Sequence, residues 1–296
     1  GHTRTVPVED GDRIWNVDTG FVVFNTETYG GLCGLFDELD IDCRESCMSF
    51  SVHCPRTGFE YQGSGLGGYY ATATSLLSPA HHLMLRDINR FHGAARRFLE
   101  APDPDVTLDQ WVVRGRYGRA FRERYLFAIG ASIWSCPQDV FASFPAAFVL
   151  AFMANHRMLQ IRNRPIWRTV VGGSDRYVAA IEARLRGPIH RRTPVRSVSR
   201  NPGGPTIQLA SGERRTFDHV ILACHADQAR SLVDHPEPEE RRILDCFPYT
   251  DNDVVLHTDD RLLPRRRRAR ASWNFRLGAG DDPPAVTYDM RRLQGL

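Results

Sequence analysis

Residues 167–185, WRTVVGGSDRYVAAIEARL, have the pattern of a strand, a tight turn and a helix in succession. The run from Trp167 to Val171 is short, apolar and rich in β-branched residues, which is typical of a strand. Gly172 and Gly173 can adopt the backbone angles of a sharp turn. Ser174 is a favoured N-cap residue, so a helix is predicted to follow over residues 174–185. The order strand, turn, helix indicates an α/β fold.

The same pattern extends in both directions along the chain. Residues 15–24 (WNVDTGFVVF) predict a strand that is followed by a helix over residues 27–39. Residues 219–223 (HVILA) are fully apolar, as in the buried strands of parallel sheets. Further strands are predicted at residues 194–200, 206–209 and 253–258.

The middle of the chain has helical spacing instead. Apolar residues recur every three or four positions over residues 79–99, which predicts a long helix with Leu83, Ile88, Phe91 and Phe98 on its buried side. Thr107 and Gln110 have the spacing of a capping box. Further helices are predicted at residues 117–131 and 145–156, and a hairpin at residues 49–61. The chain therefore predicts two domains, each built from discontinuous pieces.

Composition limits the class of protein. A chain of 296 residues with 42% hydrophobic and 25% charged residues has the composition of a folded protein of about two domains. All 38 basic residues are arginine and are distributed among 35 acidic residues, so no nucleic-acid partner is predicted. One dense arginine run, residues 265–268 with Arg270, is interpreted as a solvated loop. Contact of this run with anionic lipid or a phosphate remains an alternative.

Cysteine spacing and hydropathy limit the compartment. Seven cysteines without a C-x-x-C pair argue against a zinc site and a disulfide framework, and indicate free thiols in a reducing cytoplasm. His53, His81 and His82 lack a third ligand at metal spacing, so no metal site is predicted. No apolar stretch is long enough to cross a bilayer. A cytoplasmic protein is expected, with peripheral membrane contact left open.

Several segments in the same order resemble the superfamily of flavin-containing amine oxidases, protoporphyrinogen oxidases and phytoene desaturases. Gly1-His2-Thr3-Arg4-Thr5-Val6 resembles its Gly-Gly-x-x-x-Ser/Thr element, and Asp18-Thr19-Gly20 resembles its D-x-G strand end. Residues 165–174 and 219–228 resemble strands of its flavin domain, and residues 189–198 resemble the strand whose valine, here Val195, meets the adenine. Residues 133–135, 273–274 and 287–294 are similar to a bacterial branch of FAD-dependent oxidoreductases.

The resemblance implies an FAD cofactor and a Rossmann-like FAD-binding domain interleaved with a mixed α+β substrate domain. The FAD-binding domain is expected to comprise residues 1–39 and 164–235, and the substrate domain residues 40–163 and 236–296. Glycines allow the backbone to approach a pyrophosphate, and arginine neutralises it. The residues implied in cofactor binding are Gly1, His2, Thr3, Arg4, Gly20, Gly172, Gly173 and Val195.

The sequence also departs from the family pattern. It contains no complete G-x-G-x-x-G element with a following acidic residue and no closing Gly-Asp segment. We therefore expect an internal fragment that does not hold FAD tightly and is inactive alone. It has no lysine for the water-holding role that the family places on the strand predicted at residues 253–258. His257 on that segment is interpreted as a structural histidine, with a proton relay as the alternative. No catalytic residue is assigned.

The implied activity is hydride transfer to flavin from a small-molecule or lipid-like substrate that is oxidised or desaturated. Two alternatives remain: a flavin-dependent isomerase or mutase without net oxidation, and a non-catalytic lipid- or partner-binding module. A group of aromatic residues predicts either an apolar substrate channel or ordinary core packing, with packing favoured. Its members are Trp134, Phe144, Phe148, Phe152 and Trp273.

Overall fold

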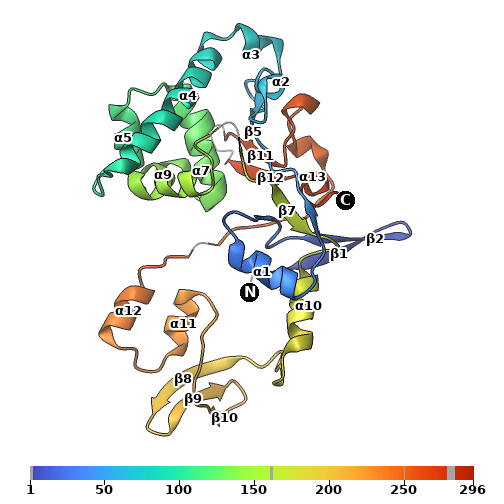
Figure 1. Ribbon diagram of the computed structural model, residues 1–296, viewed down its shortest axis with the longest axis vertical. Helices are drawn as coiled ribbons and strands as arrows, with labels where there is room; N and C mark the ends of the chain where they lie inside the picture. Colours follow the sequence, from blue (N-terminus) through green and yellow to red (C-terminus); the bar gives the residue numbers. More distant parts are fainter. Residues whose placement is uncertain (1–2, 161–162, 250, 279–283) are drawn as a thin grey trace. The chain divides into compact units, whose positions relative to one another are not determined.

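The computed structural model describes residues 3–160, 163–249, 251–278 and 284–296, and it divides into two compact units (Figure 1). The larger unit comprises Thr3–Val178 and Leu256–Leu296, and the smaller one comprises Ala179–Val255. These two units are defined by contacts between residues. The division predicted from sequence instead separates residues by function, into flavin-binding and substrate-binding pieces. The assignment of residues 1–39 and 164–235 to a flavin domain therefore stays a prediction.

A helical layer contains most of the core of the larger unit. The predicted long helix is confirmed as α4 (Pro79–Glu100), which buries Met84, Ile88, Phe91 and Ala95 at intervals of three and four residues. Leu83, predicted to be buried, is 54% exposed. The predicted capping box is also confirmed, because Thr107 Oγ1 accepts the amide of Gln110 at the start of α5 (Leu108–Arg114).

The helix predicted at residues 117–131 is confirmed as a continuous helical run that contains a π-helical turn. It consists of α6 (Arg119–Phe121), a π-helical turn η1 (Arg122–Leu126) and α7 (Phe127–Trp134). Helices α8 (Gln138–Ala142) and α9 (Ala146–Asn155) complete the layer. Its fully buried side chains form one apolar cluster that includes Phe91, Phe121, Phe141, Leu150 and Met153.

A four-stranded sheet packs against this helical layer. The predicted hairpin is confirmed as β5 (Phe50–Cys54) and β6 (Phe59–Gln62). β11 (Trp273–Arg276) runs parallel to β5, and β12 (Ala285–Tyr288) pairs with β11, so the strand order is β12-β11-β5-β6. The last segment of the chain thus returns to the sheet beside Phe50. The short helices of this region are α2 (Leu66–Tyr69), α3 (Ala73–Leu77), η2 (Asp260–Leu262), η3 (Arg267–Ala269) and α13 (Met290–Gln294).

The α/β beginning of the chain forms a second, smaller core. The three-stranded sheet has the order β3-β7-β4, with β3 (Phe24–Asn25), β7 (Trp167–Val170) and β4 (Cys43–Glu45). α1 (Gly30–Glu38) packs Phe36 against Phe24 and Val170. β4 lies beyond residue 39, so this sheet extends across the predicted domain boundary. An antiparallel ribbon, β1 (Thr5–Asp10) with β2 (Arg13–Asp18), precedes the sheet.

The smaller unit is an antiparallel sheet with two short helices. Its strands are β8 (Val195–Asn201), β9 (Gly204–Leu209) and β10 (Arg214–Thr216), and its helices are α11 (Ala226–Leu232) and α12 (Pro238–Leu244). The strands predicted at residues 219–223 and 253–258 are wrong, because neither segment pairs with another described strand. Ile221 is 90% exposed. An apolar run becomes a parallel strand only where neighbouring strands satisfy its backbone, and no described strand forms a ladder with either segment.

One buried histidine of the helical layer predicts a pH dependence. His92 on α4 is 4% exposed, and burial, followed by the charges of Arg164 and Arg96, lowers its pKa to about 4. The unfolded chain therefore binds more protons than the folded one between about pH 6.5 and 4. The free energy of unfolding should fall as the pH is lowered through this window, by about 2 kcal/mol at about pH 4.5.

Chemical denaturation at a series of pH values measures this loss. The variant His92→Gln cannot titrate, so its stability should depend less steeply on pH over the same window. A variant with the same slope as the wild type contradicts the assignment to His92.

Candidate flavin site

A buried carboxylate organises the region where the predicted cofactor-binding segments meet. Asp18, the last residue of β2, is 2% exposed. Its oxygens accept hydrogen bonds from Thr5 Oγ1 at 2.6 Å, Ser174 N at 2.9 Å and Gln294 Nε2 at 2.9 Å. Ser174 Oγ lies 2.8 Å from Asp18 Oδ2. One side chain thereby joins the β1–β2 ribbon, the turn after β7 and the C-terminal helix α13.

The same contacts occupy the start of helix α10 (Asp175–Arg184). Ser174 precedes the helix as predicted, but its amide donates to Asp18, and the amide of Asp175 donates to Thr5 Oγ1 at 3.1 Å. The amide of Arg176 donates to the carbonyl of Gly173. Since protein groups satisfy these first amides, the end of α10 is not a vacant anion site.

The two glycines of the turn have different surroundings. Both have positive φ, +82° at Gly172 and +104° at Gly173. Gly173 is buried, and a Cβ atom there would lie 2.7 Å from Thr5 Cγ2. Gly172 is exposed, and its carbonyl accepts the side-chain amide of Asn16 at 3.1 Å. Gly173 therefore permits close packing against β1, whereas the side chain of Arg176 lies over Gly172, at the place that a Cβ atom there would take.

The remaining predicted residues of the larger unit lie beside this network. Thr3 Oγ1 is hydrogen-bonded to the Tyr177 hydroxyl. The carbonyl of Arg4 accepts the amide of Thr19 at 2.8 Å, which places Arg4 next to Gly20. The side chain of Arg4 is exposed and forms no ion pair within the described part of the chain. Gly1 and His2 lie outside the described residues.

These surroundings fit the pyrophosphate of a dinucleotide cofactor. The guanidinium of Arg4 supplies an unpaired positive charge, and the exposed backbone at Gly20 allows close approach. The acidic group of the site, Asp18, is buried and fully hydrogen-bonded, so it does not present its charge at the surface. Sequence reasoning identified the D-x-G motif but missed Asp18 as the connecting residue. It also missed Gln294, which no local pattern marks.

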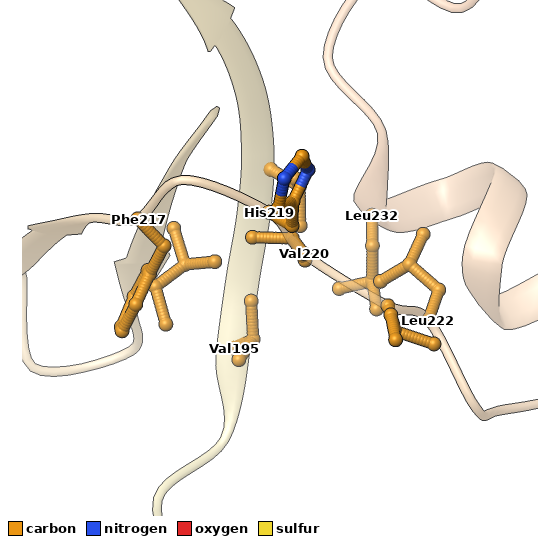
Figure 2. Close-up of a pocket in the computed structure, with 9 residues that line it drawn as sticks. Val195, Phe217, His219, Val220, Leu222 and Leu232 are labelled. Atoms are coloured by element: carbon orange, nitrogen blue, oxygen red, sulfur yellow. The ribbon is translucent and has the colours of Figure 1, made fainter. Parts of the chain in front are cut away.

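Val195 belongs to the smaller unit. It opens β8 and lines an apolar depression of about 320 Å³ (Figure 2). Val198, Phe217 and Leu232 contribute apolar walls, and His219 supplies an imidazole ring. An apolar recess of this size suits a planar ring. Contact of Val195 with adenine stays a prediction.

The other sequence candidates occupy ordinary structural positions. Trp134 contacts Phe144, Phe148 and Phe152 with ring centroids 4.7–6.0 Å apart. Trp134 and Phe144 pack against the main core, but Phe148 is 52% exposed, so core packing describes only part of the group. Trp273 packs separately against Tyr288. His257 is exposed and accepts the amide of Asp259 at 3.1 Å, in an irregular segment and not on the predicted strand. Within the described residues, no cluster of three His, Cys, Asp or Glu side chains could hold a metal ion.

Comparison with known proteins agrees with this geometry. The model of the family of flavin-containing amine oxidoreductases matches residues 1–281. AofH of Mycobacterium tuberculosis (strain CDC 1551 / Oshkosh), named as a flavin-containing monoamine oxidase, is 29% identical over 153 residues, 51% of this chain and 33% of AofH.

Solved structures share the fold. Putrescine oxidase bound to putrescine has a TM-score of 0.60 at 20% identity, over 83% of this chain and 55% of that one. Cyclohexylamine oxidase from Brevibacterium oxydans IH-35A has a TM-score of 0.59 at 12% identity, over 81% of this chain and 54% of that one. The mixed α/β architecture predicted from sequence is therefore confirmed, at the level of a fold resembling these oxidases.

The chain belongs to the family of flavin-containing amine oxidoreductases. Membership confirms the predicted resemblance and, with it, FAD as the cofactor of the family. The chain spans about half the length of the solved relatives and aligns with a third of AofH. No described helix is both long enough and apolar enough to span a membrane.

Proposed function

We propose that the protein containing this chain is an FAD-dependent oxidoreductase that oxidises a small organic substrate, with an amine as the favoured class. The family match over residues 1–281 carries this proposal. The relatives named as monoamine, putrescine and cyclohexylamine oxidases favour an amine over a lipid-like substrate. When bound, the flavin ring supplies the chemistry by accepting a hydride equivalent from a substrate C–H bond.

The described residues contribute to cofactor binding in this proposal. The Arg4 guanidinium neutralises the pyrophosphate, with Gly1, His2 and Thr3 in the same stretch, and the backbone at Gly20 and Gly172 approaches it. Asp18 holds these segments in register. Residues 1–39 and 164–235 contribute to a Rossmann-like FAD-binding domain, with Val195 at the adenine, and residues 40–163 and 236–296 to the substrate domain. The cytoplasmic location stays a prediction.

A flavin absorbance spectrum of the protein from its complete reading frame tests the proposal, with the 296-residue chain measured alongside. The complete protein should be yellow, and an oxidisable amine should bleach it. Isomerised product without net oxidation, and without dependence on oxygen or a quinone, would favour the isomerase alternative. A colourless protein that cannot be loaded with FAD would favour the non-catalytic module.

The variant Arg4→Gln tests the site in the same protein. Loss of one charge-assisted hydrogen bond should weaken FAD binding at least about tenfold. Arg13→Gln, which removes an exposed arginine from the same ribbon, is the matched control and should leave FAD affinity unchanged. Equal FAD affinity of Arg4→Gln and Arg13→Gln contradicts a pyrophosphate contact by Arg4.

A further inference from the structure

An unpaired run of arginines lies on the larger unit, away from the Asp18 network in sequence. The arginine run (Arg265, Arg266, Arg267 and Arg268) is exposed. Its guanidinium groups form no ion pair within the described part of the chain. The acidic residues that precede it pair elsewhere, Asp259 with Arg261 and Asp260 with Arg270. The run therefore presents four uncompensated positive charges to solvent.

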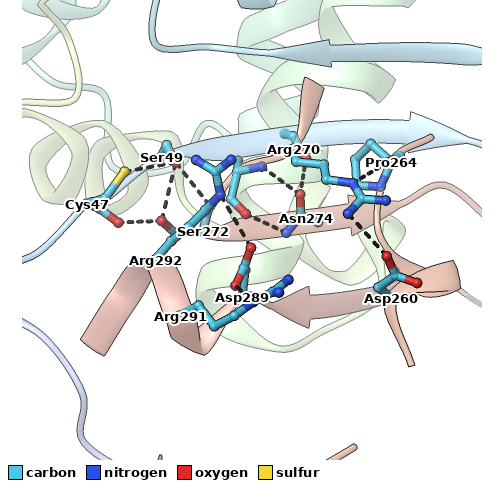
Figure 3. Close-up of polar contacts among 12 residues, drawn as sticks. Cys47, Ser49, Asp260, Pro264, Arg270, Ser272, Asn274, Asp289, Arg291 and Arg292 are labelled. Atoms are coloured by element: carbon cyan, nitrogen blue, oxygen red, sulfur yellow. Dashed lines mark hydrogen bonds and ion pairs between the residues drawn. The ribbon is translucent and has the colours of Figure 1, made fainter. Parts of the chain in front are cut away.

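The backbone beneath this run is firmly held. The buried carboxylate of Glu60 accepts the amides of Arg265 at 2.8 Å and Arg266 at 2.9 Å. Arg270 donates to the carbonyl of Pro264 at 2.9 Å and pairs with Asp260 (Figure 3). Leu263 and Ala269, which flank the run, are buried. These contacts hold the backbone of the run, while its side chains are exposed, as the solvated loop favoured from sequence predicts.

Exposed leucines lie on α2, which contacts the arginine run, and on the two helices that follow it in the chain, α3 and α4. Helix η3, which contains Arg267 and Arg268, packs against α2, where Leu66 is 68% exposed. The Tyr70 hydroxyl after α2 lies 2.9 Å from His82 Nδ1, and His82 Nε2 lies 2.8 Å from the carbonyl of Leu76. These bonds fix α3 beside α4. The leucine patch comprises Leu66 together with Leu76, Leu77 and Leu83, the last three 55%, 81% and 54% exposed.

We propose that the leucine patch and the arginine run together dock the protein on an anionic lipid bilayer. Exposed leucines on α2, α3 and α4, with the unpaired arginines beside α2, match the apolar and basic parts of an interfacial membrane surface. Charge complementarity selects anionic headgroups, since each arginine near such a surface adds about 1 kcal/mol, roughly fivefold in affinity. A nucleic-acid surface would offer aromatic side chains for base stacking, whereas the patch offers leucines. The inference goes beyond the proposed flavin chemistry and stands without it.

Vesicle cosedimentation tests the arginine run. The protein should bind vesicles of phosphatidylcholine mixed with phosphatidylglycerol, bind phosphatidylcholine alone weakly, and lose affinity as salt is raised. Replacing all four arginines by glutamine should lower affinity for the anionic vesicles at least about a hundredfold. The matched control removes four exposed arginines of the smaller unit, Arg186, Arg192, Arg196 and Arg214, and changes the net charge equally. The control should bind nearly as the wild type, and equal losses in both variants overturn the proposal.

Two further measurements test the leucine patch and distinguish a lipid bilayer from a nucleic acid as the ligand of this surface. Leu77→Ser should weaken binding to the anionic vesicles about tenfold with unchanged thermal stability, because Leu77 is 81% exposed. Unchanged vesicle affinity of Leu77→Ser overturns the role of the leucine patch. If the four-arginine variant keeps its vesicle affinity but loses binding to a single-stranded RNA probe, the surface is a nucleic-acid site and the membrane proposal is wrong.

Discussion

Asp18→Ala is expected to lower the free energy of unfolding of the larger unit by about 4 kcal/mol. The carboxylate is buried and accepts hydrogen bonds from Thr5, Ser174 and Gln294. Without it, the Thr5 hydroxyl and the Ser174 amide lose their acceptor, and each unsatisfied buried donor costs about 1–3 kcal/mol. Ser174 Oγ keeps the carbonyl of Phe21 as an alternative acceptor at 2.8 Å, which limits the loss.

Asp18→Asn separates the charge from the shape. Asparagine preserves the side-chain volume but directs an amide NH2 toward other donors. Asp18→Asn should therefore lower the free energy of unfolding about half as much as Asp18→Ala does. Chemical denaturation followed by circular dichroism measures both. The control is Asp12→Asn, an exposed residue in the turn of the same ribbon, whose effect should stay within about 0.5 kcal/mol. A similarly small effect of Asp18→Ala would show that the network is dispensable for stability.

The fold could be predicted from sequence where local patterns decide it. Helix α4, the capping box at Thr107 and the β5–β6 hairpin each have a periodicity or turn chemistry contained within a few residues. The segments at residues 219–223 and 253–258 show the limit of that reasoning. Their apolar composition permits a strand, but strand formation depends on neighbours that the segment itself does not encode.

The candidate site was predictable in part for a similar reason. The glycines at 172 and 173 and the D-x-G motif have recognisable patterns, so the sequence predicted them as parts of one site, and the structure brings them together at Asp18. Their connection through Asp18 spans 156 positions to Ser174 and 276 to Gln294, and no spacing rule reaches that far. The contrast between the buried Gly173 and the exposed Gly172 likewise depends on the packing of Thr5, which is a tertiary contact.

Gly173→Ala is expected to destabilise the larger unit by about 3–4 kcal/mol. Alanine at a φ of +104° is strained by about 1–3 kcal/mol. The new methyl group would also lie 2.7 Å from Thr5 Cγ2, and such overpacking adds about 1–3 kcal/mol. Gly212→Ala is the matched control for the backbone contribution, because Gly212 has a φ of +90° and no atom within 4 Å of its would-be Cβ. The losses of unfolding free energy in Gly173→Ala and Gly212→Ala should differ by about 2 kcal/mol. This difference measures the steric contact with Thr5 without the backbone strain.

Thr5→Ser tests that contact directly, because it deletes Cγ2 and retains the hydroxyl that donates to Asp18 and accepts from Asp175. The double variant should recover about 1–2 kcal/mol of the Gly173→Ala loss, measured by chemical denaturation as a double-mutant cycle. The backbone strain at residue 173 should remain. If Gly173 instead serves only the approach of a cofactor, Gly173→Ala and Gly212→Ala will cost the same without flavin, Thr5→Ser will rescue nothing, and the defect will appear in FAD affinity alone. The cycle thus distinguishes a glycine required for packing from one required for binding.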